Sequence, residues 1–352
     1  MKPLLGCKVV DFSHMIAGPF ATFYLAQLGA TVTKVESPNG GDLMRRTRPG
    51  STAFESFNSG KQFLEVNLKT PDGLAEARTL AAEADVFVDN FRPGVLDRLG
   101  LGYDAVRELN PRIVYCGISG YGRANPELAG RGAYDHIMQA LVGMTMLAGK
   151  EGDPPIKSGI PVIDLATGIL SAFAIVCALR ERDRTGKGAL LDVSMWAAAL
   201  QTLYPFACDA LTFGTPTERL GNQGWTGSPA VDIFQCRDGW ISIGANTAAQ
   251  MDQLLKALSI EPVAIPAKKT VGESGIAQVD DAAALNARLS QAIAKLSAHE
   301  LEHQLNTAGV PAARVRTVHE FVAEFRDRGF LVPTVLGSNG TLSPGLGWQV
   351  LR

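Results

Sequence analysis

The sequence predicts an α/β protein with a large domain built on a Rossmann-like parallel sheet and a smaller α+β domain. In the first half of the chain, short runs of β-branched and apolar residues alternate with helical stretches. The length of 352 residues suits about two domains, and the pattern changes character after about residue 225. Repeated strand–helix–strand units imply a mostly parallel sheet with helices on both faces.

The elements of the large domain follow one another in regular order. Residues 8–12 are a short apolar run and predict the first strand. The next helix is expected at 19–28, since Pro19 fits a first helical position and Gly29 ends the helix. Residues 31–35 are β-branched and predict the second strand. The same alternation predicts helices at 73–83, 103–109 and 165–182 and strands at 85–88, 112–118 and 190–194.

A second domain is expected after a cluster of glycine and polar residues at 221–228. Two strands, 230–235 and 240–245, flank an Asp238-Gly239 turn, and helical segments follow. We therefore expect a large domain over 1–200, a linker over 201–224, a small domain over 225–325, and a segment 326–352 that returns to the large domain.

Charge and cysteine content limit the partners and the compartment. Lys and Arg total 33 against 35 for Asp and Glu, a net charge of −2, so nucleic acid and anionic membranes are not expected partners. The five cysteines form no CxxC pair and favour a reducing compartment. The most apolar stretch, 165–179, is shorter than the about 20 residues of a membrane span. The N-terminus has no long apolar run. We expect a soluble, cytoplasmic protein that acts on small molecules.

Two stretches resemble known binding motifs, but neither is expected to bind its usual ligand. One glycine lies between Phe12 and Pro19, where a dinucleotide-binding GxGxxG needs three, so NAD is not expected. His299 to His303 matches HExxH, a zinc-binding pattern. However, Ser297 and Glu300 form a capping-box pattern, which predicts a short solvated helix and no metal site. Glu320 and Glu324 leave a third ligand formally open.

Asp164 is the most informative single residue. It directly precedes an almost uniformly apolar helix, where free N–H groups and the helix dipole stabilise a carboxylate. Apolar surroundings would strip water from the carboxylate and make it a poised nucleophile if a cleft opens there. From the residues alone, an ordinary helix cap and a nucleophile both remain open.

Motifs along nearly the whole chain resemble those of the family III coenzyme A transferases, the group that includes formyl-CoA transferase and carnitine CoA-transferase. The resemblance rests on their number and order, not on any single one. In order they are Val10-Asp-Phe12, Ala17-Gly-Pro19, Leu28-Gly-Ala-Thr-Val32, Lys34-Val-Glu36, Gly41-Asp42, Asn90-Phe-Arg-Pro-Gly94, Arg98-Leu-Gly100, Asn110-Pro111, Ser119-Gly-Tyr-Gly122, Ala133-Tyr-Asp135, Asp164, Thr185-Gly-Lys-Gly188 and Ala308-Gly-Val-Pro311.

The resemblance implies a CoA transferase that works through an aspartyl-CoA thioester on Asp164. It implies that Tyr134 and Asp135 orient this nucleophile and that a glycine loop covers the site and supplies backbone donors. That loop is Gly224, Trp225, Thr226 and Gly227. CoA is implied as a substrate, with no permanently bound cofactor. The implied CoA-binding residues are Ile16, Ala17, Val66, Lys69, Asn90, Phe91, Arg92 and Arg98, with Arg45 or Arg46 replacing a family Arg-Pro where this chain has Ser37-Pro38.

Further implications concern assembly and the alternatives. The resemblance implies an interlocked homodimer with its site between the large domain and the partner's small domain. The chain ends soon after Gly347, so we expect a shortened returning segment. A related activity, 2-methylacyl-CoA racemase, needs a histidine at the position of Tyr134; His136 is two residues along and would point to the opposite helix face. A non-catalytic CoA-binding protein is the other alternative. The donor and acceptor acids stay undetermined.

Overall fold

The computed structural model describes residues 1–47, 52–124, 126–224, 226–261, 276–277, 279–326, 334–337, 340–348 and 350. The chain divides into two compact units. The first comprises residues 1–145, 157–216 and 331–352, and the second comprises residues 146–156 and 217–330. Residues 146–156 thus belong with the second unit, although they lie within the range expected for the large domain.

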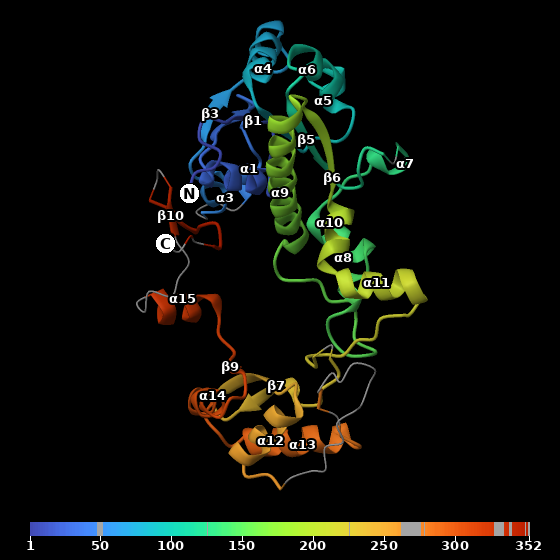
Figure 1. The fold of residues 1–352 in the computed structure, drawn as a ribbon, viewed down its shortest axis with the longest axis vertical. Helices are drawn as coiled ribbons and strands as arrows, with labels where there is room; N and C mark the ends of the chain where they lie inside the picture. The colour runs from blue at the N-terminus through green and yellow to red at the C-terminus, as the bar shows by residue number, and fades with distance from the viewer. Residues whose placement is uncertain are drawn as a thin grey trace. The chain divides into compact units, whose positions relative to one another are not determined.

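A six-stranded parallel sheet forms the centre of the first unit, in the order β3-β2-β1-β4-β5-β6 (Figure 1). This confirms the predicted parallel sheet. The edge strand β3 is missing from the sequence prediction because its four residues are mostly exposed and carry no apolar run. The strand bounds are β1 Lys8–Asp11, β2 Thr31–Glu36, β3 Gln62–Glu65, β4 Val86–Asp89, β5 Val114–Ser119 and β6 Ala189–Ser194.

Helices cover both faces of this sheet. On one face α1 (Ala17–Gln27) and α9 (Val162–Thr185) pack together, and on the other α4 (Pro71–Glu83) lies beside α6 (Tyr103–Leu109) (Figure 1). Each strand sends alternate side chains into the two cores. Val86 and Val88 join the α1–α9 side, whereas Phe87 stacks between Phe12 and Tyr115 on the other.

Smaller elements complete the first unit. They are α2 Met44–Thr47, α3 Ala53–Asn58, α5 Val95–Arg98, α7 Pro126–Ala129, α8 Asp135–Leu141, α10 Met195–Thr202, α11 Tyr204–Phe213, the 3₁₀ turn at Met144–Met146, and the antiparallel pair β10 Thr334–Leu336 and β11 Leu342–Pro344.

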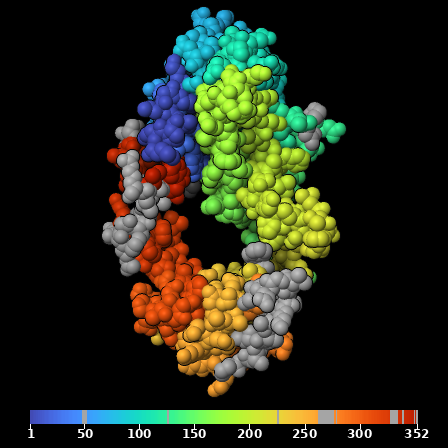
Figure 2. Space-filling view, viewed as in Figure 1, coloured from blue at the N-terminus to red at the C-terminus, as the bar shows by residue number. Residues whose placement is uncertain are grey.

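Helix α9 differs from its prediction at its start. It begins at Val162, three residues before the expected Leu165, and ends at Gly186, whose φ of 76° suits a glycine. Its length and composition would allow it to cross a membrane. One face is buried against α1 and the sheet, but Ile169 (46% exposed) and Phe173 (67% exposed) lie on an open face, visible in yellow-green in Figure 2. Within a single chain, this helix is therefore only partly buried.

The second unit is an antiparallel sheet packed against helices. The predicted hairpin around Asp238 is confirmed, although Asp238 also caps a helix. Ser297 is the N-cap of α14, as expected, but its hydroxyl donates to Asp238 and no capping box forms. The bounds are β7 Val231–Cys236, β8 Gly239–Gly244, β9 Ala312–Arg314, α12 Ala248–Ala257, α13 Ala282–Ile293, α14 Ala298–Thr307 and α15 Val318–Arg326.

The crossing of α1 and α9 depends on a glycine. A Cβ added at Gly168 would lie 2.8 Å from the carbonyl oxygen of Ala17 and 3.0 Å from the Cβ of Phe20. A backbone carbonyl cannot give way as a flexible side chain can. Gly168 therefore lets the first turn of α1 approach the second turn of α9 closely.

We expect Gly168→Ala to destabilise the first unit. The alanine gains helix propensity, but overpacking against a backbone atom costs about 1–3 kcal/mol. The free energy of unfolding, measured by denaturant titration, should fall. Gly130→Ala is the matched control, because a Cβ there meets nothing within 4 Å. Equal stability of the two variants would contradict this account of the crossing.

Candidate active site

A cavity of about 380 Å³ lies at the carboxyl ends of the first four strands. Its walls come from residues 12–14 after β1, residues 35–37 at the end of β2, residues 66–69 after β3, and Phe91 after β4. The strand order reverses between β1 and β4, and open α/β sheets bind ligands at such a point. Three residues implied by the resemblance, Val66, Lys69 and Phe91, line this cavity.

Asn90 joins the loops that follow β1 and β4. Its amide oxygen accepts the N–H of His14 at 2.9 Å, and its Nδ2 donates to the His14 carbonyl at 2.6 Å. The ring of His14 lies edge-on against Phe91 and lines the cavity. Burial lowers the pKa of His14, so its imidazole is neutral at pH 7. Sequence reasoning assigned no role to this histidine.

Fully buried charges fix the turn that leads from β1 into α1. Asp11 pairs with Lys61 at 3.0 Å and accepts a hydrogen bond from Thr22 at 2.6 Å. Burial opposes the charge of Asp11, but Lys61, Lys34 and the hydroxyl donors outweigh it and hold its pKa well below the usual range. Such pairs are costly to break, because removing one partner leaves a buried charge uncompensated.

A second buried pair holds the next residues of the same turn. Lys34 lies 3.1 Å from Asp42 and donates to the carbonyl of Ser13 at 2.5 Å. Asp42 accepts the N–H of Met15, which has a φ of 68°. This left-handed conformation is strained for a methionine and persists because the surrounding pairs fix it. Ile16 and Ala17 follow directly, at the N-terminus of α1.

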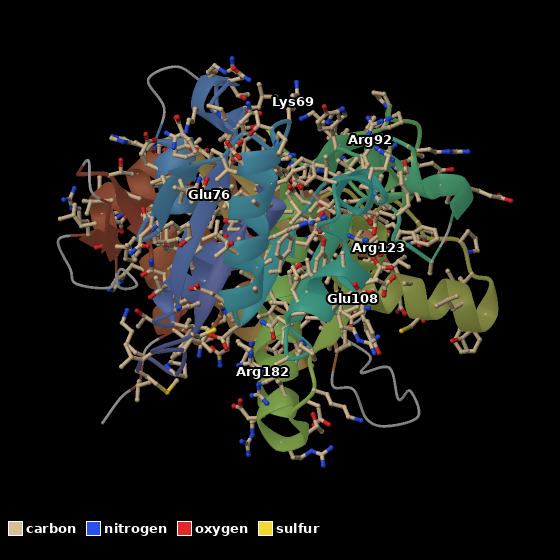
Figure 3. All side chains as sticks on the ribbon, turned by 90° about the horizontal axis from the view of Figure 1, so that it is seen from above. Lys69, Glu76, Arg92, Glu108, Arg123 and Arg182 are labelled. Carbon is tan, nitrogen blue, oxygen red and sulfur yellow. The ribbon has the colours of Figure 1, made fainter. Side chains whose placement is uncertain are left out.

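The cationic residues implied for CoA differ in availability. Lys69, Arg92 and Arg98 are exposed, and Figure 3 places Lys69 and Arg92 at one side of the sheet with Arg182 at the other. Arg45 is engaged elsewhere: it forms an ion pair with Glu36 at 2.7 Å, and its guanidinium stacks on Phe54 at 3.7 Å. Arg46 lies against Gly40.

Asp164 is the third residue of α9, so the expectation that it is the N-cap is wrong; Pro161 occupies that position. Among the described residues, no hydrogen-bond donor contacts its carboxylate. Burial, reinforced by the negative charge of Asp135, raises the pKa of Asp164 to about 7. One helical turn later, Gly168 contacts Ala17, so Asp164 lies on the helix face that meets the start of α1.

Asp135 holds the backbone of this first turn. Its Oδ2 accepts the N–H of Ile163 at 2.7 Å and of Asp164 at 3.1 Å, and its Oδ1 accepts a hydrogen bond from Gln139. The aspartate thus does for α9 what an N-cap side chain does in other helices. The structure brings Asp135 and Asp164 together through the backbone.

Tyr134 is the N-cap residue of α8. Its side chain is 60% exposed, and its ring stacks on that of His136 with centroids 6.1 Å apart. The expected opposite orientation of Tyr134 and His136 is wrong, because Tyr134 has the extended backbone of an N-cap and is not part of α8. The two rings lie side by side.

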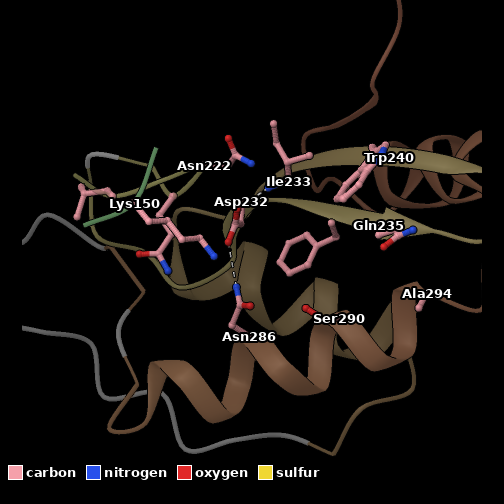
Figure 4. Close-up of a pocket in the computed structure, with 12 residues that line it drawn as sticks. Lys150, Asn222, Asp232, Ile233, Gln235, Trp240, Asn286, Ser290 and Ala294 are labelled. Atoms are coloured by element: carbon pink, nitrogen blue, oxygen red, sulfur yellow. Dashed lines mark hydrogen bonds between the residues drawn. The ribbon is translucent and has the colours of Figure 1, made fainter. Parts of the chain in front are cut away.

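The glycine loop lies in the second unit, and Trp225 is outside the described residues. Gly224 donates its N–H to Val231, and Thr226 donates its hydroxyl to Asn246 at 2.8 Å. A cavity of about 550 Å³ adjoins the loop, between β7 and α13, with Asp232 bonded to Asn286 (Figure 4). None of the residues implied for the site lines this cavity.

Of the two acids left open as a third metal ligand, Glu324 is held in an ion pair with Arg316 at 2.8 Å. Glu302, within α14, binds the same Arg316 at 2.8 Å. Within the described ranges, no group of three or more His, Cys, Asp or Glu side chains is arranged to hold a metal ion.

We expect Asp164→Asn to stabilise the protein in a pH-dependent way. Because the folded pKa lies above the unfolded one, the wild-type protein loses stability as pH rises from about 4 to 7, and the full penalty persists above 7. The uncharged amide of the variant does not carry this cost of burying a charge. The gain in unfolding free energy should be near zero at pH 4 and reach ~2–4 kcal/mol at pH 8.

Chemical denaturation of both proteins at several pH values measures this gain. The Asp209→Asn variant serves as a control, since Asp209 lies on the exposed side of α11. A gain that is constant with pH, or that grows toward low pH, would show that Asp164 is not a buried acid with a raised pKa.

Comparison with known proteins places these features in a family. The chain matches CoA-transferase family III over residues 4–349. It is 31% identical to a succinate–glutarate CoA-transferase of Agrobacterium fabrum, over 98% of this chain and 88% of that protein. It is 38% identical to a mouse succinyl-CoA:glutarate CoA-transferase, over 74% of this chain and 60% of that protein. The chain spans about 60% of the length of the first curated relatives it matches.

Solved structures agree with the sequence comparison. A CaiB/BaiF family protein from Brucella suis superposes with a TM-score of 0.85 and 32% identity, covering 99% of this chain and 93% of the other. A protein from Mycobacterium tuberculosis superposes with a TM-score of 0.83 and 28% identity, covering 100% and 94%. With a family match across nearly all of its residues, this chain belongs to CoA-transferase family III.

Proposed function

We propose that this protein transfers coenzyme A from an acyl-CoA donor to a free carboxylic acid through an aspartyl-CoA thioester on Asp164. The observation that carries the proposal is the state of the Asp164 carboxylate. It is poorly solvated, has a pKa of about 7, and is approached by no hydrogen-bond donor among the described residues. A carboxylate in this state is a stronger nucleophile than one paired with donors.

Each step conserves the energy of the thioester. A carboxylate oxygen of Asp164 attacks the acyl carbonyl carbon, the C–S bond breaks, and CoA leaves as its thiolate. The thiolate then attacks the side-chain carbonyl of Asp164, forming aspartyl-CoA and releasing the donor acid as a carboxylate. The acceptor carboxylate repeats the two steps in reverse order and regenerates the free Asp164. Water must be kept away from both intermediates.

The CoA site is proposed at the 380 Å³ cavity. Val66 and Phe91 offer apolar walls for the chain of the cofactor, and Lys69, Arg92 and Arg98 are free to meet its phosphates. Arg45 contributes indirectly, since it neutralises Glu36, whose carboxylate lines the same cavity. Tyr134 and the described glycine-loop residues Gly224, Thr226 and Gly227 remain proposed site residues, as does Trp225.

Short dicarboxylic acids are the proposed acids. Relatives are named for succinate, glutarate and mesaconate, and both donor and acceptor then carry a second carboxylate for recognition. We also propose a cytoplasmic location. The five cysteines are free, as is usual in a reducing compartment. Burial raises the pKa values of Cys7 and Cys116 to about 12, which leaves their thiols unreactive.

A racemase is the second candidate, because His136 lies beside Tyr134 and not on the opposite helix face. This activity would exchange the α-proton of a 2-methylacyl-CoA with solvent through two acid/base groups.

Incubation with succinyl-CoA in the absence of an acceptor tests the transferase proposal. The peptide that contains Asp164 should gain the mass of CoA less water, and Asp164→Ala should abolish the gain. Adding glutarate should then discharge the adduct and produce glutaryl-CoA. Deuterium uptake at the α-carbon of a 2-methylacyl-CoA in heavy water, without any adduct, would instead support the racemase.

We also propose the homodimer that the family resemblance implies. Its support is the apolar surface that the first unit leaves open, including Phe173 on α9 and Leu211 and Phe213 on α11. Analytical ultracentrifugation should give twice the mass of 37.4 kDa at submicromolar concentration. Phe173→Asp should weaken the dimer, whereas Glu76→Gln, at an exposed position on α4, should not. A monomer at all concentrations would contradict the proposal.

A further inference from the structure

Gln139 on α8 is buried, with 1% of its surface exposed, and has no role in the sequence analysis or in the proposed reaction. It lies one helical turn after Asp135, so both side chains are on the same face of α8. Its amide oxygen accepts the N–H of Ser158 at 2.8 Å. Its Nε2 donates to Oδ1 of Asp135 and, at 3.5 Å, to the carbonyl of Ile160.

These hydrogen bonds identify which atom of the Gln139 amide is the oxygen and which is the nitrogen. The N–H of Ser158 requires an acceptor, so the group facing it is the amide oxygen. The other end faces a carboxylate and a carbonyl, which both require a donor. A carboxylate at this position would meet two acceptors. An apolar side chain would remove the acceptor of the Ser158 N–H and the donor to Oδ1 of Asp135, whereas the Ile160 carbonyl would keep its bonds from Ser158 and Val162.

The amide of Gln139 connects both ends of the segment that leads into α9. Ser158 begins this segment, and its hydroxyl exchanges hydrogen bonds of 3.3 Å with the backbone of Ile160. At the other end of the segment, the N–H groups of Ile163 and Asp164 donate to the second oxygen of Asp135. A continuous series of hydrogen bonds therefore runs from Ser158 through Gln139 and Asp135 to the backbone of Asp164.

We propose that Gln139 is a positioning residue for the nucleophile: through its amide it orients Asp135 and locks residues 158–164, so that the Asp164 carboxylate is held in place by its backbone alone. The inference rests on the proposed role of Asp164. Holding the nucleophile by its backbone has a specific chemical advantage. Within the part of the chain that the structure describes, the carboxylate is directed without any donor on its own oxygens, so those residues do not reduce its nucleophilicity by hydrogen bonding.

This role predicts an effect on the chemical step and not on substrate binding. Gln139 does not line the cavity proposed for CoA, so its loss should leave the KM for acyl-CoA nearly unchanged. Displacement of a reacting group by about 1 Å can cost about 100-fold in rate. A residue that only supports the fold would instead lower the amount of active protein in proportion to stability.

The experiment compares Gln139→Leu and Gln139→Glu with Ser171→Ala. Ser171 is also fully buried, lies two turns further along α9, and donates to the carbonyl of Thr167 at 2.8 Å, without any contact to Asp135. Single-turnover formation of the Asp164 adduct should slow about 10- to 100-fold in both Gln139 variants, with KM changed less than about threefold. Ser171→Ala should retain the wild-type rate.

Gln139→Glu matters because it keeps the shape of the side chain and removes the donor. A wild-type rate in Gln139→Glu, or slowing in Gln139→Leu no greater than in Ser171→Ala, would overturn the positioning role. A KM that rises as kcat falls would place Gln139 in substrate binding and also overturn it.

Hydrogen exchange gives a readout that does not depend on activity. Peptides covering 158–165 should exchange faster in Gln139→Leu than in the wild type, and should be unchanged in Ser171→Ala. If the wild-type protein forms no adduct, the proposed function fails. Accelerated exchange would then still show that Gln139 holds this segment, and unchanged exchange would overturn that as well.

Discussion

The carboxylate of Asp135 accepts the first free N–H groups of α9, and the geometry of the candidate site depends on this contact. Because no side chain of α9 caps its own N-terminus, the helix begins where α8 supplies an acceptor. The same negative charge lies close enough to Asp164 to raise its pKa. Burial is the larger cause of that raised pKa, and Asp135 adds to it. One group therefore sets where the nucleophile lies and contributes to how tightly it holds its proton.

The turn between β1 and α1 is held by a different kind of interaction. Four buried charges, Asp11, Lys61, Lys34 and Asp42, form two ion pairs around the turn that follows β1. Buried pairs add little net stability, but each is demanding about geometry. Here they hold Met15 in a left-handed conformation and direct the chain into α1, whose first turn contacts α9 at Gly168. The two helix starts are thus positioned independently of any ligand.

Much of this fold was predictable because parallel strands and their helices carry local signals. The strands at Val86 and Val114 and the helix at Tyr103 were found within two residues of their observed starts. The short helices α2 and α3 and the edge strand β3 were not found, since tertiary packing stabilises them more than local sequence does.

The candidate site also combines residues that the sequence indicates with contacts that only the folded chain creates. Asp164 became a candidate from its place before an apolar helix, and the family resemblance made it the proposed nucleophile. The resemblance also supplied Val66, Lys69 and Phe91, which line the cavity. The cap by Asp135, the contacts of Gln139, and the capture of Arg45 by Glu36 join residues between 4 and 29 positions apart through side-chain geometry. A single sequence contains no signal for such contacts. The closest approach to a signal is a glutamine among the apolar residues of α8, and its burial is known only once the helix has been placed in the fold.

The composition of α9 also bears on how the chain is made. During synthesis the apolar part of this 24-residue helix presents the hydropathy of a membrane anchor to the cell's sorting machinery. What distinguishes it is a set of small and polar residues that the fold buries, Thr167, Gly168 and Ser171, with Gly168 against the start of α1. Since α1 is synthesised well before α9, its docking surface already exists when α9 emerges. The order of elements along the chain therefore favours capture by the protein's own core over capture by a lipid bilayer.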